Sequence, residues 1–300
     1  MFVVTGASGN TGSVVADQLL ASGQKVRVVS RDPKHLASLI QRGAEPFAAD
    51  LTDTPALARA FEGARGVYVL IPPKIDAPDI RGYQEKVSDS IAAALAAAKV
   101  SYAVALSSIG ADKPAKTGPV LGLQKFEEKL NRISALNVLF IRAGYFMENL
   151  LPQVGVIQNF GMMAGPVRGD LRLPMIATRD IGAFAGDVLA KLDFTGKQTR
   201  ELLGQRDVTY NEIAPIIGNA IGQPGLQYQQ LPGAQLKPAL TQMGMSPNMA
   251  DLLLEMAESL NSGYMAALEP RSPQNTTPTS IEEFVQTDFV PRFQGKTAAA

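Results

Sequence analysis

The sequence predicts an α/β fold in which a doubly wound parallel sheet is followed by a smaller α+β C-terminal lobe. Three observations predict it. Strand and helix patterns alternate through the first half of the chain, the strands are short apolar runs, and methionine, proline and glycine become more frequent after residue 142. Such alternation implies parallel strands joined by right-handed crossover helices. Strands without polar alternation are typical of a sheet that is covered on both faces.

Six segments of the first half have the composition of buried strands. They contain short runs of Val, Ile, Leu and Ala, and Pro72-Pro73 stops the fourth of them. The predicted strands are residues 2–5, 25–30, 45–49, 66–71, 102–107 and 137–141.

Helical patterns connect these strands. The first helix has Val15 and Leu19 at helical spacing and is ended by Gly23. Pro33 stands in the first turn of the second, where its missing N–H costs little. The predicted helices are residues 11–22, 33–42, 55–62, 80–99 and 118–135.

The second half mixes helices with short strands. We expect residues 1–150 to form the core domain and residues 151–300 the smaller lobe, with about 172–206 returning to the core. The tail at 296–300 is expected to be loose. The predicted elements are helices at 180–192, 209–221, 235–243 and 248–262, and strands at 172–175 and 200–203.

Composition excludes several classes of function. The 28 basic and 28 acidic residues balance, so the electrostatic signature of a nucleic-acid-binding protein is missing. The sequence has no cysteine and a single histidine, which excludes disulfides, thiol catalysis and a Cys- or His-rich metal site. The most apolar run, residues 90–100, is far shorter than the ~20 residues of a membrane span. We therefore expect a soluble, cytoplasmic protein without a leader, a metal or a membrane partner.

A glycine-rich loop follows the first strand and opens the first helix. Three glycines recur at every third position, after a strand and before a helix. Only in this context does such a loop indicate a dinucleotide-binding site. They permit a tight turn, close approach of the backbone to a pyrophosphate, and close packing of helix on strand. The helix N-terminus offers free N–H groups to the phosphates. The sequence therefore predicts a Rossmann domain that binds NAD(P) through Gly6, Ser8, Gly9, Asn10, Thr11 and Gly12.

The run from Thr5 to Gly12 resembles the short-chain dehydrogenase superfamily. More narrowly, the chain resembles the NmrA-like family, an atypical branch that includes quinone reductases, triphenylmethane-dye reductases, isoflavone-type reductases and cofactor-sensing regulators. The resemblance covers most of the chain. Its further support lies in the motifs at residues 31–33, 50–53, 142–149 and 277–284.

The end of the second strand favours NADP over NAD. An NAD site normally has Asp or Glu there, whereas this chain has Ser30 and Arg31. Arg31 can pair with a 2′-phosphate, and Lys34 can add a second cation. Asp32 argues for NAD, because a small change of register would point it at the ribose. A solvated loop position for Arg31 is the other alternative.

The resemblance also implies an adenosine site. Asp50 and Leu51 follow the third strand, where the family holds the adenine, and Leu70, Ile71 and Pro72 follow the fourth, where the chain passes the adenosine. For Leu70 and Ile71 plain core packing is the alternative.

The catalytic residues of the superfamily are only partly present. The resemblance places Ser107 at the serine position and Lys125 at the lysine position, where lysine also binds the nicotinamide ribose. Leu121, four residues before Lys125, stands where the catalytic tyrosine is expected. Tyrosine-dependent carbonyl reduction is therefore not predicted. A surface position for Lys125 remains the alternative.

Aromatic residues follow the sixth strand, near the expected nicotinamide. Tyr145 and Phe146 suit the wall of a pocket for a flat substrate, Asn149 can hydrogen-bond it, and Tyr145 is the best spare proton donor. Alternatively, both aromatic residues anchor the second lobe.

Two functions fit these residues. The first is an NADP(H)-dependent oxidoreductase that passes hydride to a quinone-like or other flat conjugated acceptor, whose reduced form needs no strong acid. The second is a non-catalytic NAD(P) sensor of the regulatory type. An epimerase or dehydratase of nucleotide sugars is disfavoured by Leu121. We expect a small-molecule substrate and a monomer or homodimer.

Overall fold

The central sheet has seven strands, all parallel, and it confirms the predicted fold class. The computed structural model describes residues 1–296, so the tail predicted to be loose lies outside the described residues except for Lys296. The strand order β10-β6-β5-β4-β1-β2-β3 reverses between β1 and β4, the point where open α/β sheets bind ligands. The bounds are β1 (Phe2–Thr5), β2 (Val26–Ser30), β3 (Glu45–Ala48), β4 (Gly66–Val69), β5 (Tyr102–Ser108), β6 (Asn137–Ala143) and β10 (Lys197–Leu202).

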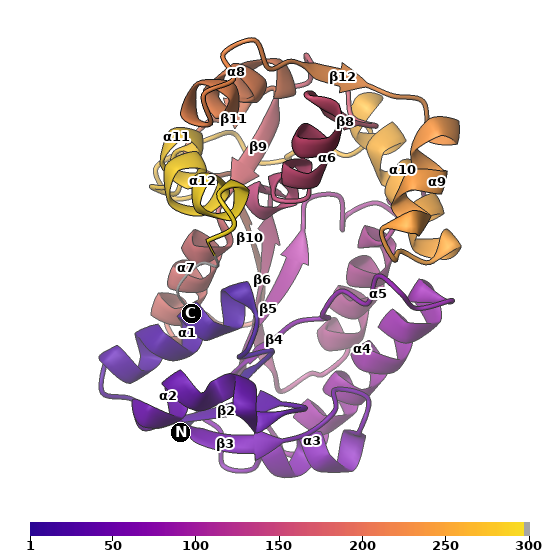
Figure 1. Ribbon diagram of the computed structural model, residues 1–300. Helices are drawn as coiled ribbons and strands as arrows, with labels where there is room; N and C mark the ends of the chain where they lie inside the picture. Colours follow the sequence, from indigo (N-terminus) through magenta and orange to yellow (C-terminus); the bar gives the residue numbers. More distant parts are fainter. Residues whose placement is uncertain (297–300) are drawn as a thin grey trace.

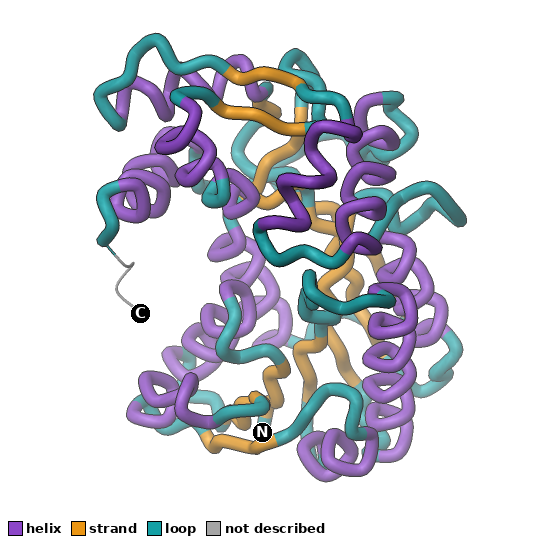
Figure 2. The backbone as a smooth tube through the Cα atoms, turned by 45° about the vertical axis from the view of Figure 1, so that its right-hand side comes forward, coloured by secondary structure: helices purple, strands orange, loops and turns teal. Residues whose placement is uncertain are grey.

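Helices cover both faces of this sheet (Figure 1), and the strands run between them (Figure 2). Strand β1 contacts the helices on both faces of the sheet, because successive side chains along a strand point to opposite faces. Phe2 and Val4 pack toward one group of helices, and Val3 packs toward the other. The first group is α1 (Asn10–Ala21), α2 (Ala37–Gln41) and α7 (Thr178–Lys191), and the second is α3 (Thr54–Phe61), α4 (Ile80–Ala97) and α5 (Val120–Asn131). The predicted helix at 33–42 begins as a 3₁₀ turn, Pro33–Leu36, before α2.

The upper half in Figure 1 is built from two small sheets and several helices. The sheets have the orders β11-β9-β7 and β12-β8. A separate hydrophobic core, including the fully buried Met163, Met175 and Ile213, holds this half together. Its elements are β7 (Tyr145–Phe146), α6 (Gln153–Phe160), β8 (Met163–Gly165), β9 (Leu173–Ile176), β11 (Asp207–Val208), α8 (Tyr210–Ala220), β12 (Tyr228–Gln230), α9 (Gly233–Gln242), α10 (Pro247–Asn261), α11 (Ile281–Phe284) and α12 (Val290–Phe293), the last two separated by a π-helical turn, Val285–Phe289.

The chain returns to the central sheet after the first part of this upper half. Helix α7 packs along α1 so closely that a Cβ at Gly182 would lie 2.7 Å from the carbonyl oxygen of Thr11. Strand β10 then pairs with β6, whereas β9 pairs with β7 and β11 outside the central sheet. The division at residue 150 stays a prediction.

Two buried carboxylates hold the start of α7 in place. Glu148 accepts hydrogen bonds from the amide and the hydroxyl of Thr178, at 2.9 and 2.5 Å. Asp180 accepts from the amide and the hydroxyl of Thr279, at 3.0 and 2.7 Å. Burial raises the pKa of Glu148 above its ordinary value. The sequence motifs at 142–149 and 277–284 therefore meet at one helix N-terminus.

Within residues 1–296, every helix is too short or too polar to span a bilayer. The same residues contain no group of three or more His, Cys, Asp or Glu side chains placed to hold a metal ion.

Candidate functional site

The glycine loop connects the end of β1 to the start of α1. Gly6 has a φ of +60°, which favours glycine, and its carbonyl accepts a hydrogen bond from the amide of Gly9 at 2.9 Å. A Cβ at Gly12 would lie 2.3 Å from the carbonyl oxygen of Gly6, so only glycine fits there without a shift of backbone. Ser8, Gly9 and Asn10 are exposed, and no side chain caps the first turn of α1. The loop therefore forms an open cradle at the N-terminus of a helix, which suits a pyrophosphate.

Thr11 has its hydroxyl turned toward the protein. The hydroxyl of the fully buried Tyr68 donates to it at 2.9 Å, and the hydroxyl of Thr5 donates to the carbonyl of Tyr68 at 3.0 Å. These bonds tie the loop to β4. Thr11 can therefore serve a phosphate through its backbone N–H, while its side chain positions the loop.

The residues after β2 and β3 lie close together. Hydrogen bonds from the hydroxyl and the amide of Thr52, at 2.7 and 2.8 Å, lower the pKa of Asp50 below its ordinary value, and the charge of the exposed Arg31 adds to this shift. Asp32 is occupied as a helix cap, since its carboxylate accepts from the amide of Lys34 at 2.9 Å. Arg31 and Lys34 thus remain exposed, while Asp32 is turned into its own loop.

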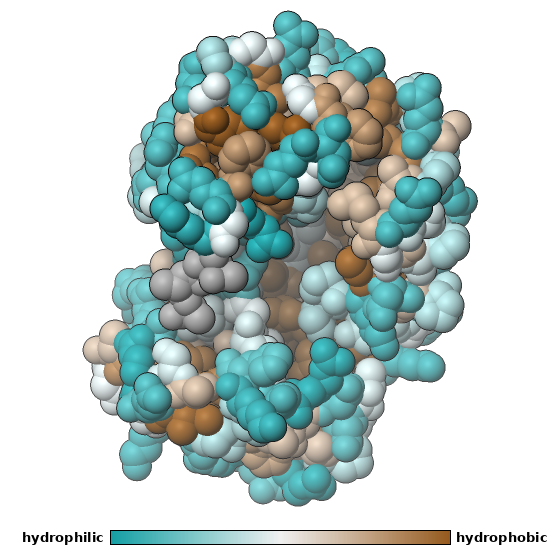
Figure 3. Space-filling view, in the orientation of Figure 1, coloured by the Kyte–Doolittle hydropathy of each residue, from teal (hydrophilic) through white to brown (hydrophobic). Residues whose placement is uncertain are grey.

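A cavity of about 310 Å³, here called the sheet-edge cavity, lies at the carboxyl ends of β4, β5 and β6. Figure 3 shows the hollow between the two halves, with hydrophobic residues at its bottom. The predicted site residues that line it are Leu70, Ile71, Pro72, Ser107, Tyr145, Phe146 and Asn149. The predicted adenosine contacts and the predicted aromatic wall therefore meet in one cavity.

Ser107 belongs to a buried polar network. Its hydroxyl donates to the carboxylate of Glu127 at 2.5 Å, and Arg142 binds the same carboxylate through two nitrogens, at 3.0 and 2.6 Å. The side chains of Glu127 and Arg142 are only 7% and 15% exposed. The Glu127 carboxylate raises the pKa of Arg142 above its ordinary value. The neighbouring Ser108, which also lines the cavity, is free of this network, since its hydroxyl donates only to the carbonyl of Ile109 at 3.0 Å.

Lys125 lies on α5 outside the residues that line the sheet-edge cavity. Its side chain is 55% exposed, and its Nζ pairs with Glu128 at 3.1 Å. The structure therefore does not bring Lys125 to the other predicted residues, and its role stays a prediction.

Tyr145 stands at the head of a row of three tyrosines. The hydroxyl of Tyr210 donates to that of Tyr145 at 3.4 Å, and the ring of Tyr210 stacks on Tyr228 with centroids 4.4 Å apart. Burial raises the pKa of Tyr145 above its ordinary value, so its phenol keeps its proton at neutral pH. Because Tyr145 accepts from Tyr210, its own O–H remains available to a bound molecule.

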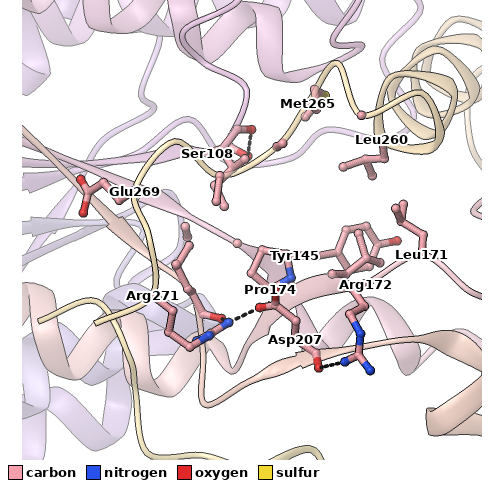
Figure 4. Close-up of a pocket in the computed structure, with 18 of the residues that line it drawn as sticks. Ser108, Tyr145, Leu171, Arg172, Pro174, Asp207, Leu260, Met265, Glu269 and Arg271 are labelled. Atoms are coloured by element: carbon pink, nitrogen blue, oxygen red, sulfur yellow. Dashed lines mark hydrogen bonds and ion pairs between the residues drawn. The ribbon is translucent and has the colours of Figure 1, made fainter. Parts of the chain in front are cut away.

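Tyr145 also lines a second cavity of about 340 Å³, here called the lobe cavity (Figure 4). Apart from Tyr145, the residues that line it were not predicted from the sequence, because they come from widely separated segments and form no local motif. Gly144 also borders it, and a Cβ there would lie 2.1 Å from the carbonyl oxygen of Pro174. Residues labelled in Figure 4 include Leu171, Arg172, Pro174, Asp207, Leu260, Met265, Glu269 and Arg271.

Comparisons of the sequence with known proteins found a matching family and similar proteins. The family model described as "NmrA-like family" matches residues 1–285. An NAD(P)H azoreductase of Xenophilus azovorans is 29% identical over 280 residues, covering 92% of this chain and 93% of that protein.

Solved structures share the fold. The NADPH-dependent quinone oxidoreductase of Escherichia coli, in complex with NADPH, has a TM-score of 0.77 at 21% identity, covering 100% of this chain and 96% of that one. The triphenylmethane reductase of a Citrobacter species, in complex with NADP(H), has a TM-score of 0.81 at 17% identity, covering 95% of this chain and 99% of that one.

Proposed function

This chain belongs to the NmrA-like family, and from that membership we propose that it is an NADP(H)-dependent reductase of flat, conjugated acceptors such as quinones or dyes. The observation that carries the proposal is the glycine loop. Its Gly12 leaves no room for a side chain, and its Gly6 packs against Leu70, which lines the cavity at the carboxyl ends of β4, β5 and β6. The relative named as an NAD(P)H azoreductase and the solved quinone and dye reductases support the same class of acceptor.

The cofactor proposal depends on the residues after β2. Arg31 is exposed beside Asp50, whereas Asp32 is engaged by the amide of Lys34. A guanidinium in this position can bind a 2′-phosphate through two charge-assisted hydrogen bonds. This arrangement favours NADP, and NAD remains the second candidate.

Replacing Arg31 with alanine tests that preference. We expect Arg31→Ala to raise the Kd of NADPH more than tenfold, or ~1.4 kcal/mol, and to leave the Kd of NADH nearly unchanged. Fluorescence titration of both cofactors measures this, with Arg132→Ala, an exposed arginine at the far end of α5, as the matched control. Equal losses for NADPH and NADH would show that Arg31 does not bind the 2′-phosphate.

The reduced nicotinamide supplies the hydride when it is bound. The chain's own residues then have three tasks. Leu70, Ile71 and Pro72 offer an apolar surface to the cofactor, and Phe146 and Asn149 orient a flat acceptor. Tyr145 holds a proton at its hydroxyl for the reduced acceptor. We keep Lys125 as a proposed ribose ligand, which requires its side chain to leave Glu128.

Tyr145→Phe tests the proton donor. We expect kcat with a quinone to fall about tenfold, below the roughly 10²–10⁴ of typical general acid catalysis, because a quinol anion is stable without a perfectly placed acid. Because burial raises the pKa of Tyr145, the wild-type kcat should show no loss from its titration below pH 10. Steady-state rates over pH 6–9.5 measure both effects, and Tyr102→Phe, whose ring packs on Phe194 away from the cavity, is the control. An unchanged kcat in Tyr145→Phe would remove this residue from the mechanism.

The function as a whole is tested with purified protein, NADPH and a panel of quinones and azo or triphenylmethane dyes. We expect oxidation of NADPH, followed at the absorbance band of the reduced nicotinamide, with at least one acceptor class. Tight binding of NADPH without turnover of any acceptor would overturn the reductase and favour the sensor.

A further inference from the structure

The lobe cavity and the sheet-edge cavity are neighbours that share part of their lining. Their volumes are about 340 and 310 Å³, each near the lower end of the range for small-molecule sites, ~300–1,000 Å³. Four residues line both: Ser108, Gly144, Tyr145 and Met256. These shared residues place the two cavities next to each other at Tyr145.

The inner wall of the lobe cavity is apolar. Ile109, Leu173, Leu260 and Met265 line it, and each is less than a tenth exposed. Such a wall stabilises a bound hydrocarbon in proportion to the apolar area that leaves water. Methionine in addition adapts its shape to different ligands.

The charged residues at the rim of the lobe cavity already have partners. Arg271 donates to two backbone carbonyls and pairs with Asp207. Arg172 donates to the carbonyl of Asp207 at 3.3 Å and lies 3.5 Å from the carboxylate of Glu212. Glu269 accepts from a backbone amide of β10 at 3.3 Å. Because these charged groups pair with one another or with the backbone, an ionic ligand would have to compete with contacts that already exist.

We propose that the acceptor site has two compartments, and that the lobe cavity binds an uncharged aliphatic or aryl extension of the acceptor whose reducible ring lies beside Tyr145. The inference rests on the proposed reductase function and narrows its substrate class. The preferred acceptor is an elongated molecule, with a flat reducible head and an apolar, neutral tail.

Three quinones with the same benzoquinone head test the proposal: one without a tail, one with a decyl tail, and one whose tail ends in a carboxylate. We expect kcat/KM for the decyl quinone to exceed that of the tail-less quinone at least tenfold, through KM. The carboxylate should remove most of this gain. In Ala266→Phe, which adds a ring at an exposed loop position lining only the lobe cavity, the decyl preference should fall at least fivefold with the tail-less rate unchanged.

The control is Ala239→Phe on α9, which lines neither of the two cavities. If the tail-less quinone is reduced and the decyl quinone is not preferred, the two-compartment site is overturned, while the proposed reductase function is not contradicted. A preference for the quinone with the carboxylate tail overturns the proposal that the lobe cavity binds an uncharged tail. Failure to reduce any of the three quinones, with NADPH bound, counts against the reductase function, and the inference falls with it.

Discussion

Replacing Arg142 with methionine is expected to lower the free energy of unfolding by about 3–5 kcal/mol. Arg142 is the bidentate partner of Glu127, and the remaining contact of that carboxylate is the hydroxyl of Ser107. Methionine fills a similar volume but leaves the carboxylate buried without a cation. Loss of one partner from a buried pair is costly because the other charge stays in a medium of low dielectric.

Chemical denaturation at neutral pH measures this loss. The exposed pair of Arg42 and Asp17, whose side chains are 44% and 46% exposed, provides the matched control. Arg42→Met should cost less than ~1 kcal/mol. The double variant Glu127→Gln/Arg142→Met should recover part of the stability, because it buries no charge. A loss in Arg142→Met no larger than in Arg42→Met would show that the network adds nothing.

Gly12→Ala is expected to raise the Kd of NADPH at least 100-fold, or ~2.7 kcal/mol. The new methyl group would lie 2.3 Å from the carbonyl oxygen and 2.7 Å from the carbonyl carbon of Gly6, both backbone atoms that cannot rotate away. Relief requires a shift of the glycine loop or of α1. Either shift moves the free N–H groups away from the pyrophosphate.

Calorimetric titration with NADPH measures the binding, and thermal unfolding shows that the variant is folded. Overpacking of this kind also costs typically ~1–3 kcal/mol of stability. Gly155→Ala is the matched control, because a Cβ there meets no described atom within 4 Å and the residue lies inside α6. It should leave binding unchanged. A Kd for Gly12→Ala within threefold of the wild type would contradict the proposed phosphate cradle.

The central sheet was predictable because each strand carries its own local signal. Val3 and Val4, which lie on opposite faces of one strand, are both apolar, and Gly23, Gly43 and Gly63 follow the first three connecting helices. Strand β10 was predicted only in part, at 200–203, because Lys197 and its neighbours are exposed and polar at the edge of the sheet. The helices at 153–160 and 281–293 were missed, since Gly155 and Pro291 obscure the helical pattern there.

In the candidate site, too, the residues of local motifs could be predicted from the sequence, and those that depend on the packing of distant segments could not. The glycine loop and the residues at strand ends are local, so Gly6, Leu70 and Tyr145 could be chosen from the sequence. Side-chain direction was not predictable: Thr11 faces Tyr68, and Lys125 faces Glu128. The lobe cavity could not be predicted from the sequence, because its walls depend on how distant segments pack.

The late position of β10 in the chain has a consequence for synthesis. Strand β6 ends at Ala143, but the strand that covers it ends at Leu202, roughly 60 residues later. At ~5–20 residues per second, the nascent chain exposes an unpaired parallel edge for roughly 3–12 s. Val138, Phe140 and their neighbours make that edge apolar, which is the kind that pairs with other chains. The time for which this edge stays unpaired is therefore set by how fast residues 144–202 are completed, and the stability of the finished protein does not change it.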